Sequence, residues 1–202
     1  MKIKKLHNLF LFSFIVFSFI TSCVIMPEGQ KEEVKDLKSI KKDEVIIVGR
    51  IVLDPPLTKK EREYSGHLKT LSDFENKASF SCFNVKPSKD KTIVEQNSKT
   101  DGYFYAQLGK PFYIKSSNRT FYIGGGNIRS STLSINLPAR FKVNVERNDK
   151  AIYVGTIIYR RDDFDSITKI EFVDEYDKIK RKFHKKFGNN IDLRKSLLQA
   201  VK

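Results

Sequence analysis

The stretch Leu133–Tyr159, LSINLPARFKVNVERNDKAIYVGTIIY, decides the fold class. Apolar and polar residues alternate in its first two segments, so that Phe141, Val143 and Val145 lie on one side of an extended chain. This period of two predicts strands with one buried face, which is typical of an antiparallel sheet. The segment Ile152–Tyr159 is apolar on both faces, and we therefore expect it to be a central strand.

Further β-branched and aromatic runs continue the strand pattern on both sides of this stretch. Turn signals such as Asp101-Gly102 and Leu137-Pro138 separate them. The expected strands are Glu44–Leu53, Ser79–Val85, Lys91–Glu95, Gly102–Leu108, Phe112–Lys115, Thr120–Arg129, Leu133–Leu137, Arg140–Glu146, Ile152–Arg160 and Ile167–Val173. The segment Leu57–Thr70 is expected to be a long loop. Short strands at this spacing predict a mainly β domain over residues 44–173, an antiparallel β-sandwich or a small barrel.

Residues 174–202 are expected to form a helical tail of two amphipathic helices. The first, Asp174–Phe187, has acidic residues at its start, lysines toward its end and Gly188 after it, as helix ends favour. Its apolar residues fall at helical spacing on one stripe: Tyr176, Ile179, Phe183 and Phe187. The second helix is expected over Ile191–Val201.

The first 22 residues have the pattern of an export signal. Three lysines precede the apolar run Leu9–Ile20, which is too short to span a bilayer comfortably. The run leads into Ile20-Thr21-Ser22-Cys23. These four residues resemble a bacterial lipobox, the cleavage and lipidation signal of lipoproteins, with charge, length, small residues and cysteine all in register. The alternatives are an uncleaved signal anchor, in which Cys23 is an incidental thiol, and a signal peptide cut elsewhere.

The resemblance to lipoproteins implies that the mature chain begins at Cys23 with two or three acyl chains, a number that holds a protein firmly on a membrane. Residues 23–43 are charged and poor in aromatics, and we expect a flexible lipidated tether with a reach of about 25 Å. One or two helical turns are expected between Glu32 and Lys41. The protein is thus expected in the cell envelope, at the outer membrane or cell surface, with the outer face of the inner membrane as the alternative.

Two segments resemble the transthyretin-like sandwich of carboxypeptidase regulatory domains. One is Val45–Leu53, VIIVGRIVL, and the other is Thr100–Ile114, TDGYFYAQLGKPFYI, which is similar to the dG.F.....G.Y.. hairpin of that fold. The resemblance implies a sandwich and carries over no functional residue. Such domains usually have a shorter first connection and no helical tail.

Cysteine and histidine supply few candidates for chemistry. If Cys23 carries lipid, Cys82 has no disulfide partner within the chain, and we expect a partly buried structural residue or, alternatively, a reactive or intermolecular thiol. Neither His67 nor His184 has a Cys or His at the spacing of metal ligands, and both are expected at the surface. No GxSxG, HExxH or paired CxxC occurs, so no catalytic residue, metal site or cofactor is predicted. A Ser–His–acid arrangement assembled in space stays open.

Two further motifs have a structural interpretation that we favour over a chemical one. Gly124–Gly126 follows a strand but precedes no helix start, so it predicts a bulge or tight hairpin and not a phosphate cradle. Asp162–Asp165 lacks the glycine and glutamate positions of a calcium loop. We expect a turn between two strands, with ion pairs to Arg160 and Arg161.

The most distinctive surface feature is the basic face of the first expected helix. Its candidate contacts for an anionic surface are Lys178, Arg181, Lys182, Lys185 and Lys186. The hypothesis is binding to anionic headgroups or envelope polymers, and the alternative is a solvated helix face. The chain carries a net charge of +14, but nucleic acid is not expected as a partner, because stacking aromatics are missing outside the apolar stripe and the leader exports the chain.

Together these features predict a lipid-anchored envelope lipoprotein that serves as a binding or structural module. The alternative is an enzyme or enzyme accessory acting on cell-wall or surface polymers. A cleft with two carboxylates of perturbed pKa would favour the enzyme, and an exposed apolar or aromatic patch would favour the binding module.

Overall fold

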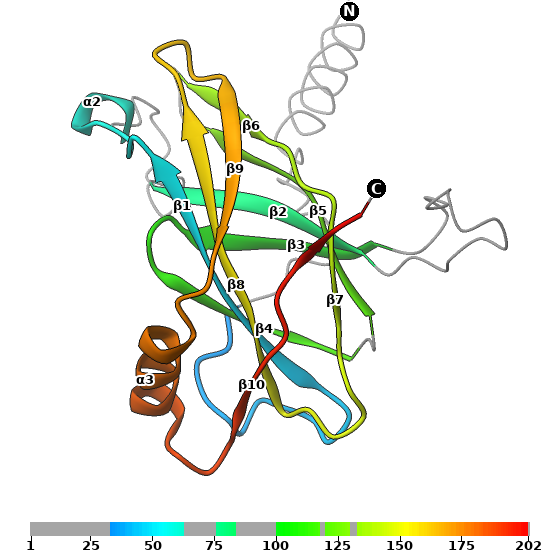
Figure 1. Ribbon diagram of the computed structural model, residues 1–202. Coiled ribbons are helices and arrows are strands. Elements are labelled where there is room, and N and C mark those ends of the chain that lie inside the picture. The colour runs from blue at the N-terminus through cyan, green and yellow to red at the C-terminus, as the bar shows by residue number, and fades with distance from the viewer. Residues whose placement is uncertain (1–32, 63–75, 84–99, 118–119, 130–132, 202) are drawn as a thin grey trace, which may run out of the picture.

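The computed structural model of the chain describes residues 33–62, 76–83, 100–117, 120–129 and 133–201. In these residues the protein is mainly β, with two sheets in a sandwich-like arrangement and a helix near the C-terminus (Figure 1). The expected fold class is thereby confirmed. The expected strand Lys91–Glu95 and residues 63–70 of the expected loop lie outside the described residues.

One sheet, here called the β8 sheet, contains the longest strand of the described residues near its centre. Its order is β10 (Leu193–Lys195), β8 (Ala151–Arg161), β1 (Val45–Asp54) and β4 (Pro111–Ser116). The fifth strand, β9 (Ile167–Val173), lies on the same edge of β8 as β10: β10 pairs with the first residues of β8 and β9 with its last residues. The central position of β8 agrees with the expectation from its two apolar faces.

The pairing of β1 with β8 is parallel, whereas antiparallel pairing was expected. Ile46 lies opposite Ala151 and Leu53 opposite Tyr159. β10 is also parallel to β8, while β1–β4 and β8–β9 are antiparallel, so the sheet is mixed. Alternation along one strand predicts which face is buried. It does not predict the direction of a neighbour about one hundred residues away in the chain, which depends on the path through the other sheet.

The second sheet, the β5 sheet, is antiparallel in all its pairs within the described residues. Its order is β11 (Gln199–Ala200), β7 (Phe141–Asn144), β5 (Thr120–Arg129), β2 (Lys77–Phe83) and β3 (Thr100–Gln107), with β6 (Ser134–Leu137) beside the other half of β5. The short turn between β3 and β4 connects the two sheets, because the two strands belong to different sheets (Figure 1).

The inter-sheet core consists of inward side chains from both sheets. Phe80 at its centre stacks on Phe104, with 5.6 Å between ring centroids. The predicted bulge at Gly124–Gly126 is confirmed, since β5 has one more residue than β2 in this part of their register. At Gly126 a Cβ atom would lie 2.3 Å from the Phe80 ring, so only glycine admits this close approach.

A second apolar layer, here called the outer-face cluster, covers the other side of the β8 sheet. Its buried members are Val34, Ile46, Val48, Tyr113, Ala151, Tyr153, Ile179, Phe183, Phe187 and Leu193. Along β8, Ile152 and Val154 belong to the inter-sheet core, while Ala151 and Tyr153 belong to the outer-face cluster. The strand is therefore apolar on both faces because both faces are covered.

The expected second helix is wrong: Ile191–Val201 forms β10 and β11 instead. Leu193 is fully buried beside β8, and the N–H of Leu198 donates to the carbonyl of Val154. The apolar residues Leu193, Leu197, Leu198 and Val201 fit one face of a helix in the sequence. The open edges of β8 and β7 instead offer backbone partners that bind the segment as an extended chain. The expected loop at Leu57 also contains a short helix, α2 (Lys59–Arg62).

Candidate functional site

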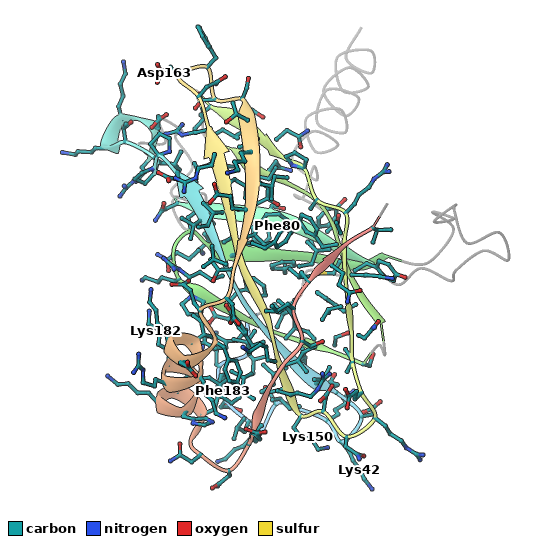
Figure 2. The ribbon with its side chains drawn as sticks, viewed as in Figure 1. Lys42, Phe80, Lys150, Asp163, Lys182 and Phe183 are labelled. Carbon is teal, nitrogen blue, oxygen red and sulfur yellow. The ribbon has the colours of Figure 1, made fainter. Side chains whose placement is uncertain are left out.

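The helix α3 (Tyr176–Phe187) presents one apolar and one basic face, as predicted. Ile179, Phe183 and Phe187 are buried, and Tyr176 is partly buried against the same cluster. Phe187 packs edge-on to Tyr113 of β4, with 5.2 Å between ring centroids. In Figure 2, Phe183 lies on the side of the helix toward the sheet and Lys182 on the side away from it.

The start of α3 is fixed to the sheet by Glu175. Its Oε2 accepts hydrogen bonds from Arg50 Nη1 at 2.5 Å and Thr156 Oγ1 at 2.8 Å, and its Oε1 pairs with Lys178 Nζ at 2.7 Å. Burial raises the pKa of this carboxyl, but the hydrogen bonds from Lys178, Thr156 and Arg50 outweigh it and lower the pKa to about 2. The Glu175 N–H donates to the hydroxyl of Tyr153 at 2.8 Å. The carboxylate therefore stays ionised at neutral pH and positions the helix.

The segment 33–43, expected to be part of a flexible tether, is packed on the same face of the sheet as α3. The Val34 N–H donates to the carbonyl of Tyr113 at 2.7 Å, and the Val34 side chain is only 3% exposed. Leu37 and Ile40 pack against the outer-face cluster. The sequence does not indicate this docking. Its three apolar residues are separated by charged ones, a composition that is also typical of a solvated linker.

Lys186 joins this segment to the end of α3. Its Nζ lies 2.8 Å from Glu33 Oε1 and 4.3 Å from the centroid of the Tyr113 ring. The pairing links residues 153 positions apart, and no sequence signal indicates it. The first described residues of the chain therefore lie directly beside the basic face of the helix.

The predicted contact residues divide into two groups. Lys178 and Lys186 are used within the fold, through Glu175 and Glu33 respectively. Arg181, Lys182 and Lys185 are exposed, and among the described residues none of the three makes an ion pair. These three cations form what we call the free basic face. Cys23 lies outside the described residues.

A second charged cluster surrounds Arg161 at the far end of β8. Its side chain is only 5% exposed, pairs with Glu61 at 2.7 Å and with Asp165, and donates to the carbonyls of Pro55 and Pro56 at 3.1 Å each. The hydrogen bond from Arg161 is the main cause that lowers the pKa of Glu61 to about 2. Its acceptors belong to the β1–α2 connection, to α2 itself and to the β8–β9 turn, so the cluster fixes these segments at the end of β8.

The turn Asp162–Asp165 is as expected in form and differs in its partners. Asp162 Oδ1 accepts the backbone N–H groups of Phe164 and Ser166, each at 2.9 Å, which closes the turn. Arg161 pairs with Asp165 as expected, but Arg160 pairs with Asp54 and Glu171. Asp163 lies at the tip (Figure 2). In the part of the chain that the structure describes, no group of His, Cys, Asp and Glu side chains could hold a metal ion.

An open depression of about 700 Å³ lies at the end of the domain marked by Lys42 and Lys150 (Figure 2). Its lining mixes cations and acids, among them Arg147 and Asp149. Asp149 is already bound by Arg194, whose Nη2 lies 2.5 Å from Asp149 Oδ2. The depression therefore has no charge of one sign that would select a ligand.

The remaining sequence candidates are Cys82, His184 and His67. Cys82 is buried in the inter-sheet core, as expected. His184 lies on α3 beside Phe183 and is partly buried, where a surface residue was expected. His67 lies outside the described residues. Within the described ranges, no helix is long and apolar enough to cross a membrane.

Comparisons with known proteins identify no relative. No family model matches the chain, and no curated protein and no solved structure is similar to it at a significant level.

Proposed function

We propose that this chain is a lipid-anchored cell-envelope lipoprotein whose β-sandwich is a binding or structural module. In this proposal Cys23 carries the lipid, and the free basic face of α3 contacts an anionic membrane or envelope polymer. The observation that carries the proposal is the docking of segment 33–43 beside α3. It brings the chain out of the domain on the face that carries the exposed cations.

The length of chain between Cys23 and the docked segment supports this orientation. Cys23 and Glu33 are ten residue steps apart, with nine residues between them. Fully extended this stretch reaches at most about 35 Å, and as a flexible coil about 17 Å r.m.s.. The domain is thus held closer to a lipid on Cys23 than a free tether of twenty residues would hold it. The near face is the one covered by α3 and segment 33–43, because the short connection starts there.

The strength of the contact follows from the number of free cations. Each Lys or Arg near an anionic membrane contributes roughly 1 kcal/mol, so Arg181, Lys182 and Lys185 together supply about 3 kcal/mol at low salt. That is weak for a soluble protein. For a protein already held on the surface by acyl chains it is enough to orient the domain. The anchor keeps the domain near the membrane, so the contact of α3 is an intramolecular event and does not have to offset the entropy lost on association.

The anchor is tested by Cys23→Ala in the full chain. We expect loss of palmitate labelling and loss of the processed, membrane-bound form. Unchanged labelling would show that Cys23 is not the lipidated residue. Cys82→Ser is the matched control, because Cys82 is buried in the core and should leave labelling unchanged.

The basic face is tested on the chain from residue 24 onward without lipid, which keeps every described residue. Arg181→Glu, Lys182→Glu and Lys185→Glu combined should abolish flotation with phosphatidylglycerol-containing vesicles at low salt. The control combines Lys59→Glu, Lys60→Glu and Lys110→Glu, which change the net charge equally at exposed positions of α2 and the β3–β4 turn. Equal loss in both variants would show that net charge alone drives binding. No flotation of the unmodified chain would exclude the anionic membrane as the partner of α3.

A further inference from the structure

We propose that β9 is a pairing edge, through which two copies of this chain join their β8 sheets about a two-fold axis. One edge of β9 pairs with β8, and among the described residues no strand pairs with its other edge. Unpaired edges are usually protected by proline, charged side chains such as lysine, bulges, very short length or a covering segment. β9 has seven residues and no proline, and its bulge lies at its start, where Lys169 is opposite Arg160 and Ile167 is opposite Arg161. Its charged residues Lys169 and Glu171 have opposite signs, and Phe172 and Val173 at its end are 47% and 38% exposed.

The faces of β9 follow from its register with β8. Phe172 lies opposite Ile157 and Ile170 opposite Tyr159, both members of the inter-sheet core, so Phe172 and Ile170 point inward. Lys169 and Glu171 have the opposite parity and point to the outer face. Phe172 contacts Phe141 of the β5 sheet at 4.9 Å between ring centroids, which agrees with this assignment.

A two-fold pairing of β9 with itself admits only a few registers, and the charges distinguish them. An axis perpendicular to the sheet keeps inward residues opposite inward residues, so the register can shift only in steps that preserve parity. With Ile170 opposite its own copy, each Lys169 lies opposite a Glu171 of the other chain. Centring the pair on Lys169 or on Glu171 instead places like charges directly opposite, which is destabilising. Of these three registers, only the one centred on Ile170 places opposite charges opposite each other.

The position of α3 makes this arrangement compatible with a membrane anchor. α3 and segment 33–43 both cover the outer face of the β8 sheet. A two-fold axis perpendicular to that sheet leaves both copies of α3 on the same side. If the orientation proposed above holds, both basic faces and both anchors then meet one membrane. The pairing itself does not depend on the anchor, and its test does not use it.

Cysteine cross-linking of the full chain tests the register. Opposed residues in antiparallel strands have Cα atoms about 4.5–5.5 Å apart, which a disulfide can bridge. Under mild oxidation Ile170→Cys should form a covalent dimer. Thr168→Cys is the matched control, because its two copies would lie four residues out of register, about 14 Å apart. Absence of the Ile170→Cys dimer, or equal dimer from Thr168→Cys, would overturn the proposal.

Charge exchange in the Ile170→Cys background tests the specificity. Lys169→Glu alone and Glu171→Lys alone should each lower the dimer yield about fivefold or more, because two cross-strand pairs then carry like charges. The combined exchange should restore the dimer yield. It also leaves a carboxylate near Arg160 of the same chain, since residue 169 lies opposite Arg160 in β8. Failure of the combined exchange to restore dimer would overturn the register.

A measurement on the unmodified chain guards against variants that fail to fold. Carbodiimide treatment of a mixture of ¹⁴N and ¹⁵N chains should yield a mixed-isotope link between Lys169 and Glu171. The two residues also lie 3.0 Å apart within one chain, so only the mixed-isotope product reports pairing between copies. A product confined to single-isotope links would contradict the dimer. Palmitate labelling remains unchanged in all these variants, which separates this test from that of the anchor.

Discussion

The inter-sheet core and the outer-face cluster bury opposite faces of the same strands, yet they are assembled in different ways. The core joins two sheets through the inward side chains of both. The outer-face cluster joins one sheet to pieces from both ends of the described chain, α3 and segment 33–43. One layer is the interior of a sandwich, whereas the other is a cover that also carries the proposed functional face. The difference suggests that the sandwich and its cover contribute unequally to stability.

The largest expected effect is in the inter-sheet core. Phe80 is fully buried, and Phe80→Ala should lower the free energy of unfolding by about 3–5 kcal/mol, because it removes a large side chain that neighbours on both sheets contact. Urea denaturation followed by circular dichroism measures the change. The control is Phe164→Ala. Phe164 is 88% exposed at the β8–β9 turn, so this substitution should change the free energy of unfolding by less than about 0.5 kcal/mol. A loss below about 2 kcal/mol for Phe80→Ala would show that the core is not the main source of stability.

The next effect tests whether the cover can detach from the sandwich. Phe183 is also fully buried, but we expect Phe183→Ala to cost about 3 kcal/mol, the low end of the range, because α3 can undock before the sheets separate. Limited proteolysis with trypsin should then cleave α3 while the β domain stays intact. A loss equal to that of Phe80→Ala without faster cleavage would instead make the cover an integral part of one cooperative unit.

The contrast between the two layers also explains what the sequence could predict. The period of two in β7 and the two apolar faces of β8 indicate the sandwich and its central strand, because backbone geometry converts local alternation directly into burial. The α3 stripe is predicted for the same reason at the helical period. The parallel partner of β1, the edge pairing of Leu193 and the docking of Val34 depend on contacts between distant segments. No local pattern contains that information.

The candidate site follows the same division. The basic residues of α3 could be identified from sequence, and Arg181, Lys182 and Lys185 are exposed as expected. The ion pair of Lys186 with Glu33 could not be predicted, since the two residues lie 153 positions apart in the chain. The pair of Lys178 with Glu175 has the i, i+3 spacing at which side chains on a helix meet, so the sequence does contain a signal for it. Cys23 stays a prediction from its motif.

Acidification should weaken the attachment of the cover. The pKa of Glu175 is lowered from 4.5 to about 2 in the folded protein, so its contribution to stability is present above about pH 4.5 and is lost as the pH falls toward 2. The lowering of this pKa limits the contribution of Glu175 to the free energy of unfolding to about 3 kcal/mol. We expect about 2 kcal/mol, because the Glu175 side chain is 18% exposed and solvent screens part of the interaction.

Glu175→Gln should therefore lower stability at pH 7 by about 1–3 kcal/mol and flatten its dependence on pH between 5 and 2. The comparison is between denaturation series of both proteins across that range. Glu61→Gln provides a control at the Arg161 cluster, since it has a similarly low pKa but no contact with α3. If Glu175→Gln follows the same pH curve as the unmodified protein, this carboxylate does not hold the helix.

The smallest effect distinguishes two adjacent lysines on the basic helix. Lys186 pairs with Glu33 and lies over the Tyr113 ring, whereas Lys185 is exposed and makes no ion pair among the described residues. Lys186→Glu should cost about 1–2 kcal/mol, since it removes a cation–π contact and an ion pair and places a like charge beside Glu33. Lys185→Glu should change stability by less than about 0.5 kcal/mol.

A compensating change separates the two parts of the Lys186 contact. Glu33→Lys combined with Lys186→Glu restores opposite charges but not the cation over Tyr113, so we expect it to recover about half of the loss. Thermal denaturation of the three variants measures this, and protease cleavage within residues 33–43 shows whether the segment has been released. Equal stability of Lys185→Glu and Lys186→Glu would mean that the segment is held by Val34, Leu37 and Ile40 alone. The proximity of the anchor connection to α3 would then depend on apolar packing and be insensitive to salt, whereas a contribution from Lys186 makes it weaken as salt screens the pair.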